Sequence, residues 1–558
     1  MPCVRFELEV ANLRGFSRVA GGFWRSGGGR YGGILIAEVP AAAAAMKTNA
    51  LFPLLGFSFA ALSSAMHISL NIQRPSAEVQ TLNKYPAKLH ARRVAQALNL
   101  TQGLVYLSGE VSRLIEDSDM PAFFRQKRYF YYLTGLDYPD AHVTYDLELD
   151  KLTLWILRPD PKEKLWRAND RSGPSPTPKS LVITHDIDIA NYSEDLPSAI
   201  AAYAVANPSA KVHVIHDYYP PAAKDPVPKS TFDNTKLQYA MDVCRVVKDP
   251  YEVAMIRRAN DISTKAHLRV MSEIDQLTSE RDIEALFIAE SIKRGGLLAY
   301  DTIAPSGRNC SILHYVNNDQ LLAGKQLVLL DAGAEYELYA SDVTRTFPIS
   351  GRFTPEAAQI YQLVRDMQEA VFAMVKPGVK WRDCNLRAAD VAAEGLIRLG
   401  VLVGDAKEII KSRLIGGVFF PHGLGHHVGL ETHDVLYGEL ISDKRRARMA
   451  RRSSVMTRDD FEAYTASETH NRLTPGMTLT VEPGVYFNQP LYEDFMTQFP
   501  NASKYVNEDV LAKYWDVGGV RIEDCILVTA NGFENLTKAP KEMQEVEKMV
   551  RMGKANSK

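Results

Sequence analysis

The segment PHGLGHHVGLETHD, residues Pro421–Asp434, is the part of this 558-residue sequence around which the rest is organised. It holds three glycines and four of the thirteen histidines of the chain. Glycine lets a backbone approach its neighbours closely or take a positive φ, and histidine supplies a neutral nitrogen for a metal or a proton near neutral pH. A segment that only packs a core would not be built from these residues, so it is predicted to form one wall of a site. The four histidines are His422, His426, His427 and His433.

Four carboxylates outside this segment occupy unusual positions in strand-like sequence. Asp331 ends the apolar run LVLL, and Asp342 lies further on within LYASDVTRTF. Glu482 ends TLTV and precedes Pro-Gly, and Glu523 follows Val-Arg-Ile. A carboxylate at the end of a buried strand is costly unless it is paired or bound to a metal. One such residue is usually a cap or an ion pair, but four of them beside a histidine segment predict a metal centre.

The number of donors indicates two ions rather than one. Four carboxylates and one imidazole exceed the four ligands of a structural zinc, which often include sulfur. They suit two divalent ions bridged by carboxylates, with a water or hydroxide between them, and such a pair acidifies the water and stabilises charge on a substrate oxygen. Oxygen-rich ligation favours manganese, cobalt or zinc, with selection among them set by availability. The predicted chemistry is hydrolysis.

Composition and charge argue against several other classes. A net charge of −2 gives no case for a nucleic-acid or membrane-surface partner. The five cysteines are scattered, form no CxxC pair and are odd in number. This pattern favours a reducing compartment and buried structural thiols over a disulfide framework. A basic run, KRRARMARR, lies in an expected insertion at 438–471 and is interpreted as a solvated loop.

The chain is expected to fold as two domains, because 558 residues exceed what one hydrophobic core usually supports. Residues 82–219 alternate helical and strand-like segments and predict a smaller α/β domain, with GLVYLSGE, YFYYLTG, KLTLWILRPD and SLVITH among its strands. A linker is expected at 220–236 and a tail at 541–558. The catalytic domain is expected at 237–540, where DTIAPSG and SILHYV are among the strand-like pieces.

Residues 1–80 look unlike the rest and are expected to be disordered or a product of gene misprediction. Within them, residues 46–65 have the shape of a signal peptide, with a positive residue, an apolar stretch and then small residues. The stretch is too short and too rich in serine to predict a membrane span. The sequence therefore favours a cytoplasmic protein, with a secretory route as the alternative if translation starts at Met46.

Seven motifs occur in an order that matches a known family: SILHY, LLDAGAEY, ASDVTRTFP, PHGLGHHVG, ETHDV, PGMTLTVEPGVYF and GGVRIED. With them the chain resembles, from Leu82 to Pro540, the pita-bread metallopeptidases that cleave next to proline. These are Xaa-Pro aminopeptidase (aminopeptidase P) and Xaa-Pro dipeptidase (prolidase). The segments FRQKRYFYYLTG and KLTLWILRPD resemble the amino-terminal domain of that group. The resemblance implies an α+β fold, in which a pita-bread catalytic domain follows a smaller α/β domain.

The resemblance also implies a role for each metal-site residue. The ligands would be Asp331, Asp342, His426, Glu482 and Glu523, holding two divalent ions. Manganese is the expected metal, with cobalt or zinc as alternatives. Asp342 and Glu523 would bridge the ions, Asp331 would serve one ion, and His426 and Glu482 would serve the other. Glu482 would also act as general base toward the water.

Further residues are assigned to the substrate side by the same resemblance. His314 and His433 would bind substrate and stabilise the tetrahedral intermediate, as positioned donors do for a developing oxyanion. His422 and Arg521 would take supporting and substrate-side positions. His427 is expected to point elsewhere.

The activity implied is removal of the first residue from peptides whose second residue is proline. The partners implied are such peptides and a second copy of the chain in a homo-oligomer (dimer), without nucleic acid or stable membrane association. Prolidase is the nearest alternative, and that enzyme places an arginine ahead of the proline of PGM to clasp a dipeptide carboxylate. Here the register gives Glu468, with Arg472 nearer, and a carboxylate would repel a dipeptide's C-terminus. A non-catalytic binding module and a metal-free relative such as creatinase are further alternatives.

Overall fold

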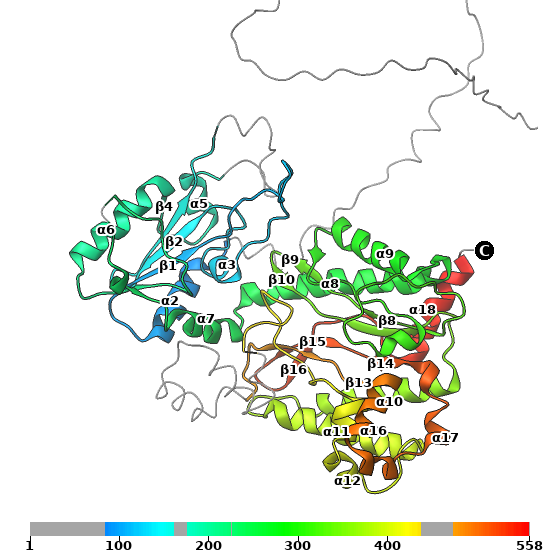
Figure 1. Cartoon of the computed structure of the whole chain (residues 1–558). Helices are drawn as coiled ribbons and strands as arrows, with labels where there is room; N and C mark the ends of the chain where they lie inside the picture. Colours follow the sequence, from blue (N-terminus) through cyan, green and yellow to red (C-terminus); the bar gives the residue numbers. More distant parts are fainter. Residues whose placement is uncertain (1–83, 161–175, 225, 437–471, 557–558) are drawn as a thin grey trace, which may run out of the picture. The chain divides into compact units, whose positions relative to one another are not determined.

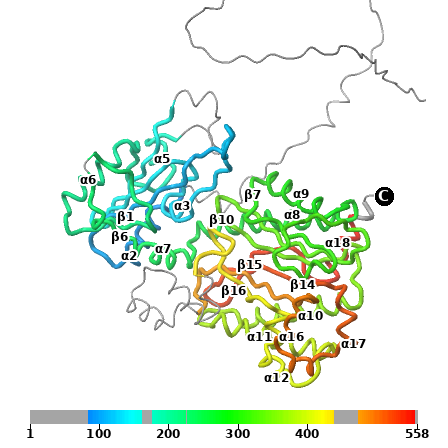
Figure 2. The backbone as a smooth tube through the Cα atoms, in the orientation of Figure 1, coloured from blue at the N-terminus to red at the C-terminus, as the bar shows by residue number. Residues whose placement is uncertain are grey.

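The structure of the protein is a computed structural model, and it describes residues 84–160, 176–224, 226–436 and 472–556 (Figures 1 and 2). The expected amino-terminal extension and the basic run of the insertion lie outside the described residues. The chain divides into two units between Leu70 and Asn71, so every described residue belongs to the second unit.

The first domain is a six-stranded sheet with the strand order β4-β3-β2-β1-β5-β6. β1, β2 and β3 pair in antiparallel fashion, whereas β4, β5 and β6 each join by parallel pairing. Successive residues of β3 enter different apolar clusters, Leu154 on one face and Trp155 on the other, so both faces of the sheet are covered. The strands are β1 (Leu104–Ser108), β2 (His142–Asp146), β3 (Lys151–Ile156), β4 (Ile189–Tyr192), β5 (Val212–His213) and β6 (Phe232–Asp233). The main helices are α2 (Ala87–Leu98), α3 (Arg128–Thr134), α5 (Pro178–Thr184) and α6 (Leu196–Ala206).

Two segments of this domain that were predicted as strands are helices. The aromatic run YFYYLTG lies in α3, which ends at Gly135 with φ +68°. The side chains from Phe130 to Thr134 are buried, and aromatic side chains can pack in a core from a helix as well as from a strand. Their β propensity therefore did not decide the structure. The segment SLVITH lies mostly in α5, which starts from a Thr177 capping box with proline in its first turn. The predicted linker is also shorter than expected, because Phe232 and Asp233 form β6.

The second domain combines short antiparallel strand pairs with long helices, which confirms the predicted α+β class. Its sheets have the orders β10-β9-β7, β11-β8, β12-β15-β16 and β13-β14. The strands are β7 (Leu297–Leu298), β8 (Leu327–Asp331), β9 (Ala334–Tyr336), β10 (Tyr339–Ala340), β11 (Thr344–Pro348), β12 (Thr478–Val481), β13 (Gly484–Tyr486), β14 (Gly519–Arg521), β15 (Asp524–Val528) and β16 (Phe533–Asn535). The helices are α7 (Leu237–Val246), α8 (Pro250–Glu273), α9 (Glu280–Lys293), α10 (Pro355–Phe372), α11 (Trp381–Arg398), α12 (Ala406–Lys411), α16 (Gln489–Gln498), α17 (Glu508–Leu511) and α18 (Met543–Asn556).

Three expectations for this domain need correction. The pieces DTIAPSG and SILHYV form no named strand; isolated bridges and the short helix η4 (Gly307–Ser311) replace them. The expected tail from residue 541 is instead mostly helix α18. Val546 and Val550 of that helix are fully buried against Val270 and Met271 of α8, and this apolar burial explains why the segment is ordered.

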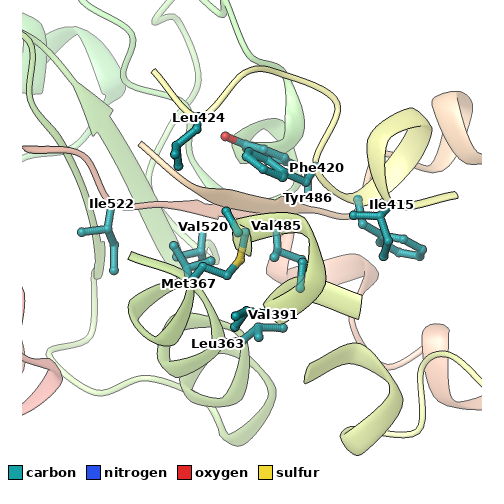
Figure 3. Close-up of a cluster of buried hydrophobic side chains, with 14 of the residues drawn as sticks. Leu363, Met367, Val391, Ile415, Phe420, Leu424, Val485, Tyr486, Val520 and Ile522 are labelled. Atoms are coloured by element: carbon teal, nitrogen blue, oxygen red, sulfur yellow. The ribbon is translucent and has the colours of Figure 1, made fainter. Parts of the chain in front are cut away.

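The core beneath the strands that carry the carboxylates is apolar and continuous. Figure 3 shows Val485 of β13 and Val520 of β14 close to Met367 and Leu363, which come from α10. Burying each such side chain contributes about 1.5–3 kcal/mol to the free energy of folding. This packed layer therefore holds in place the strands that carry the polar groups of the site. The four described cysteines are free and buried, as the sequence predicted.

Candidate metal centre

The structure brings the five expected metal-binding residues together from four separate strand ends and one loop. Asp331 ends β8, and Asp342 lies between β10 and β11. Glu482 follows β12, and Glu523 lies between β14 and β15. His426 lies in the irregular segment 421–436 that follows the short helix η5 (Ile415–Phe419). Groups of three among them, such as Asp331, Asp342 and Glu523, place one ligand atom each within 4.8 Å of the others.

Tyr300 joins two of these carboxylates. Its hydroxyl lies 2.6 Å from Oδ1 of Asp331 and 2.5 Å from Oδ1 of Asp342. A tyrosine hydroxyl has one hydrogen, so it can donate to only one of the two at a time. Burial raises the pKa of Asp331 to about 7, against the opposing charge of Arg521. The neighbouring charge of Asp342 also raises the pKa of Asp331, so the two carboxylates compete for one hydrogen at this point.

Asp342 and Glu482 lie on either side of His426. Nε2 of His426 is 3.4 Å from Oδ2 of Asp342 and 3.3 Å from Oε1 of Glu482. Burial would lower the pKa of His426, but the two carboxylates outweigh it and raise that pKa to about 10. Burial would raise the pKa of Asp342, but the hydrogen bond and charge of His426 hold it at about 2. A protonated His426 thus balances the charge of the two carboxylates. A metal cation shared by Asp342 and Glu482 would do the same.

Glu523 is almost fully buried and has one neutral hydrogen-bond donor. Oε2 accepts a hydrogen bond of 2.7 Å from Oγ1 of Thr344. Burial, together with the neighbouring charges of Asp342, Glu482 and Asp331, raises its pKa well above the ordinary value. A buried carboxylate among carboxylates is stable only with a proton or a cation.

Arg521 is the one guanidinium that faces the site among the described residues. It donates from Nη2 to Asp331 at 2.6 Å, from Nε to Thr344 at 3.1 Å and from Nη1 to the Tyr486 hydroxyl at 3.0 Å. The Tyr486 hydroxyl also lies 2.8 Å from Nε2 of His422. A continuous hydrogen-bonded chain therefore runs from Asp331 to His422.

The site opens into a cavity of about 640 Å³. The five carboxylate and imidazole donors line it, and so do His422, Arg521 and two exposed histidines, His314 and His433. The ring centroids of His426 and His433 are 4.1 Å apart. Every site residue expected from the sequence thus borders a single cavity.

His427 is directed elsewhere, as predicted. It is buried, forms an isolated bridge with Leu479 and does not belong to the described lining of the cavity. Sequence reasoning missed Tyr300, Thr344 and Tyr486, which hold Asp331, Glu523 and Arg521. Tyr300 and Tyr486, the tyrosine of EPGVYF, carry no chemical signal of their own, since a buried aromatic side chain is usually part of a core.

The donor set fits two divalent cations. It offers four carboxylates and one imidazole, and burial raises the pKa values of two of the carboxylates, Asp331 and Glu523. Hard oxygen donors suit divalent ions such as manganese, cobalt or zinc. The fold and this site define the class of a dinuclear metallohydrolase.

Comparison with known proteins agrees with this class. Residues 254–530 match metallopeptidase family M24, and residues 90–213 match the aminopeptidase P N-terminal domain. A probable Xaa-Pro aminopeptidase of Sclerotinia sclerotiorum is 43% identical over 480 residues, which span 83% of this chain and 85% of its own length. One of Pyricularia oryzae is 42% identical over 497 residues, 85% of this chain and 93% of its own.

Solved structures are similar as well. The aminopeptidase PepP of Pseudomonas aeruginosa is 28% identical with a TM-score of 0.67, covering 85% of this chain and 100% of that one. Aminopeptidase P of E. coli with the inhibitor Pro-Leu has the same TM-score and coverage at 27% identity. The chain belongs to the Xaa-Pro aminopeptidase (aminopeptidase P) family of M24 metallopeptidases, and the predicted pita-bread fold with its amino-terminal domain is confirmed.

Proposed function

We propose that the cavity hydrolyses the Xaa-Pro bond and releases the first residue of peptides with proline in second position. The observation that carries this proposal is the convergence of the five donors and three histidines on one cavity of about 640 Å³. The Xaa-Pro bond is a tertiary amide without an N–H, and proline fixes φ. A site that acts on it relies on groups directed at the carbonyl rather than on backbone pairing.

Within this proposal, Asp342 and Glu523 would serve both of two divalent cations, Asp331 would serve one of them, and His426 and Glu482 would serve the other. Manganese is the proposed metal. When bound, such a pair acidifies a water and polarises a carbonyl. Glu482 would accept a proton as general base: its carboxylate lies at the cavity surface, and the Thr480 hydroxyl orients it by donating to its Oε1 at 3.2 Å.

The histidines on the cavity wall act on the substrate. His314 and His433 offer imidazole nitrogens to the carbonyl oxygen as charge develops on it, and a positioned donor of this kind is worth about 3–4 kcal/mol. His422 is held by the Tyr486 hydroxyl, which Arg521 also contacts. Arg521 thereby orients both Asp331 and the ring of His422.

The cavity favours an aminopeptidase over a dipeptidase. Its described lining contains one guanidinium, Arg521, which is buried and already paired with Asp331. Arg472 donates to the carbonyl of Gly378 and does not belong to that lining, and Glu468 lies outside the described residues. A dipeptide's carboxylate would therefore meet no unpaired guanidinium or ammonium group in the described lining, whereas a longer peptide carries its C-terminus beyond the site.

Hydrolysis rates separate the two activities. Purified protein loaded with Mn²⁺ is expected to release the first residue from Xaa-Pro-Xaa tripeptides and to act much more slowly on Xaa-Pro dipeptides. Cleavage of the dipeptide alone would establish a prolidase instead. Activity retained after exhaustive metal removal, with the metal content checked by elemental analysis, would favour a metal-free mechanism such as that of creatinase. Failure to cleave any of these peptides with metal bound would favour the binding module.

We also propose that the protein is cytoplasmic and forms a homo-oligomer, with a dimer as the expected state. In the described part of the chain, no helix has the length and apolarity that crossing a bilayer requires. The loop after β1 exposes five large apolar side chains, a pattern found at protein interfaces. They are Val111, Leu114, Ile115, Met120 and Phe123. Light scattering of the purified chain tests the dimer, and a monomer at micromolar concentration would contradict it.

A further inference from the structure

The loop that carries His433 is fixed by ion pairs on both sides of that residue. From Pro421 to Leu436 the described chain forms no helix or strand beyond the bridge at His427. The ring of His433 is exposed at the cavity, so core packing does not set its position. The acidic residues Glu431 and Asp434 flank it in the sequence, and each binds cations from elements outside the loop.

Asp434 is the buried anchor. Its Oδ1 accepts from Nη2 of Arg245 at 2.6 Å, and its Oδ2 accepts from Nζ of Lys248 at 2.9 Å. All three side chains are at most 3% exposed. Gly429 permits this packing, because a Cβ there would lie 2.2 Å from Oδ2 of Asp434. Removing one partner of such a buried cluster costs several kcal/mol, so this anchor is also part of the fold.

Glu431 is the half-exposed anchor. Its Oε1 accepts from Nε of Arg128 at 2.9 Å, and the Glu431 side chain is 45% exposed whereas Arg128 is 6% exposed. Arg128 also donates from Nη2 to Glu335 at 2.7 Å, and Arg125 makes a second contact of 2.7 Å with Glu335. Glu335 therefore keeps one cation when Arg128 turns away, whereas Glu431 keeps only the 3.7 Å contact with Arg125.

We propose that the Glu431–Arg128 pair is a positioning device that holds the His433 ring over the cavity. The proposal rests on the proposed function, in which His433 acts on the substrate. A half-exposed ion pair contributes about 0–1 kcal/mol to stability, so this pair adds little to folding. The pair lies two residues from His433, and Arg128 itself is fixed by Glu335. A displacement of about 1 Å in a catalytic group can lower a rate by as much as about a hundredfold.

The test is Glu431→Gln in the full metal-loaded chain, assayed on an Xaa-Pro-Xaa tripeptide. We expect kcat to fall about tenfold with KM within twofold, because the substrate still binds while His433 is less often in place. Arg128→Lys is expected to do the same, since one ammonium cannot serve Glu335 and Glu431 with the fork geometry of a guanidinium. The matched control is Glu534→Gln, which removes a 2.6 Å pair with Arg257 away from the cavity; its carboxylate side chain is 39% exposed, close to that of Glu431, and its kcat should not change.

A double-mutant cycle with His433→Ala assigns the effect to the ring. His433→Ala alone is expected to lose activity by about 10²–10³-fold, and Glu431→Gln should add less than twofold in that background. Equal losses in both backgrounds, or an unchanged kcat for Glu431→Gln, would overturn the positioning role. Full activity of His433→Ala would instead refute the catalytic role assigned to His433.

Amide hydrogen exchange gives a readout that does not depend on catalysis. Residues 429–435 are expected to exchange faster in Glu431→Gln than in the wild-type chain and to be unchanged in Glu534→Gln. Unchanged exchange in both variants would show that the ion pair does not fix the loop.

Discussion

Removing the hydroxyl of Tyr300 is expected to weaken metal binding while leaving the fold intact. That hydroxyl lies within 2.6 Å of both Asp331 and Asp342, and it is held protonated because burial and the nearby carboxylates raise the pKa of Tyr300 well above its usual value. Tyr300→Phe keeps the ring and removes only this donor. The two carboxylates then lose the group that orients them toward each other.

The size of the expected loss in metal affinity follows from the single hydrogen of the Tyr300 hydroxyl. A hydrogen bond to a charged group contributes about 1.5–3 kcal/mol, and here it can be made to only one carboxylate at a time, so the loss is counted once. Because 1.36 kcal/mol corresponds to a tenfold change, metal affinity should fall by about 10–100-fold, which is the usual range for groups that orient a ligand. With saturating metal, most of the activity should return.

Isothermal titration of metal-free protein with Mn²⁺ measures this effect directly. The control is Tyr106→Phe, which removes a buried hydroxyl 2.9 Å from Nδ1 of His142 in the other domain. It should lower stability slightly and leave Mn²⁺ affinity unchanged. Unaltered Mn²⁺ affinity in Tyr300→Phe, with its stability equal to that of the control, would refute the orienting role of Tyr300.

Three further outcomes are expected. Glu482→Gln should lower kcat by about 10²–10⁴-fold because the amide cannot accept a proton, and an unchanged kcat would exclude Glu482 as the base. Gly429→Ala should lower the free energy of unfolding, measured by urea denaturation, by about 1–3 kcal/mol because its Cβ meets Asp434, whereas a neutral result would mean that the loop relaxes freely. Asp331 and Glu523 have raised pKa values, so their folded forms retain protons that the unfolded chain releases above pH 4. Raising the pH from 4 to 7 should therefore lower the melting temperature of metal-free wild-type protein relative to that of a Glu523→Gln variant, bound Mn²⁺ should remove most of this difference, and identical pH profiles of the two metal-free proteins would contradict the argument.

The carboxylates of the site were predictable because buried strand ends rarely carry charge. Asp331 and Glu482 each follow four apolar or β-forming residues, and that pattern alone predicts that a proton, a cation or an ion pair balances each carboxylate. The sequence could not show that Tyr300 lies between two of them. Tyr300 precedes Asp331 by a long, mostly irregular segment, and two isolated bridges, Ile303 with Asp331 and Ser306 with Val328, bring that segment against β8.

The failures in secondary structure have a common physical origin. The aromatic run Tyr129–Gly135 and the segment SLVITH both have compositions that favour strands, yet both are helices. In α3 every residue after Tyr129 is buried. The helical conformation was therefore determined by how the large side chains pack between the sheet and the helix. Local preference of about 1 kcal/mol is smaller than the burial of even one tyrosine.

Gly425 shows what the histidine segment contributes beyond its side chains. A Cβ at Gly425 would lie 2.1 Å from the carbonyl oxygen of Thr480, so glycine is required for close approach and not for a positive φ. This approach lets the Thr480 amide donate to the carbonyl of His426 at 2.9 Å and the Glu482 amide donate to the carbonyl of Leu424 at 2.9 Å. The segment is thus hydrogen-bonded along β12 through its backbone. The distance of 3.3 Å between the His426 and Glu482 side chains is therefore set by backbone hydrogen bonds, which hold two residues from distant parts of the sequence in fixed register before any cation binds.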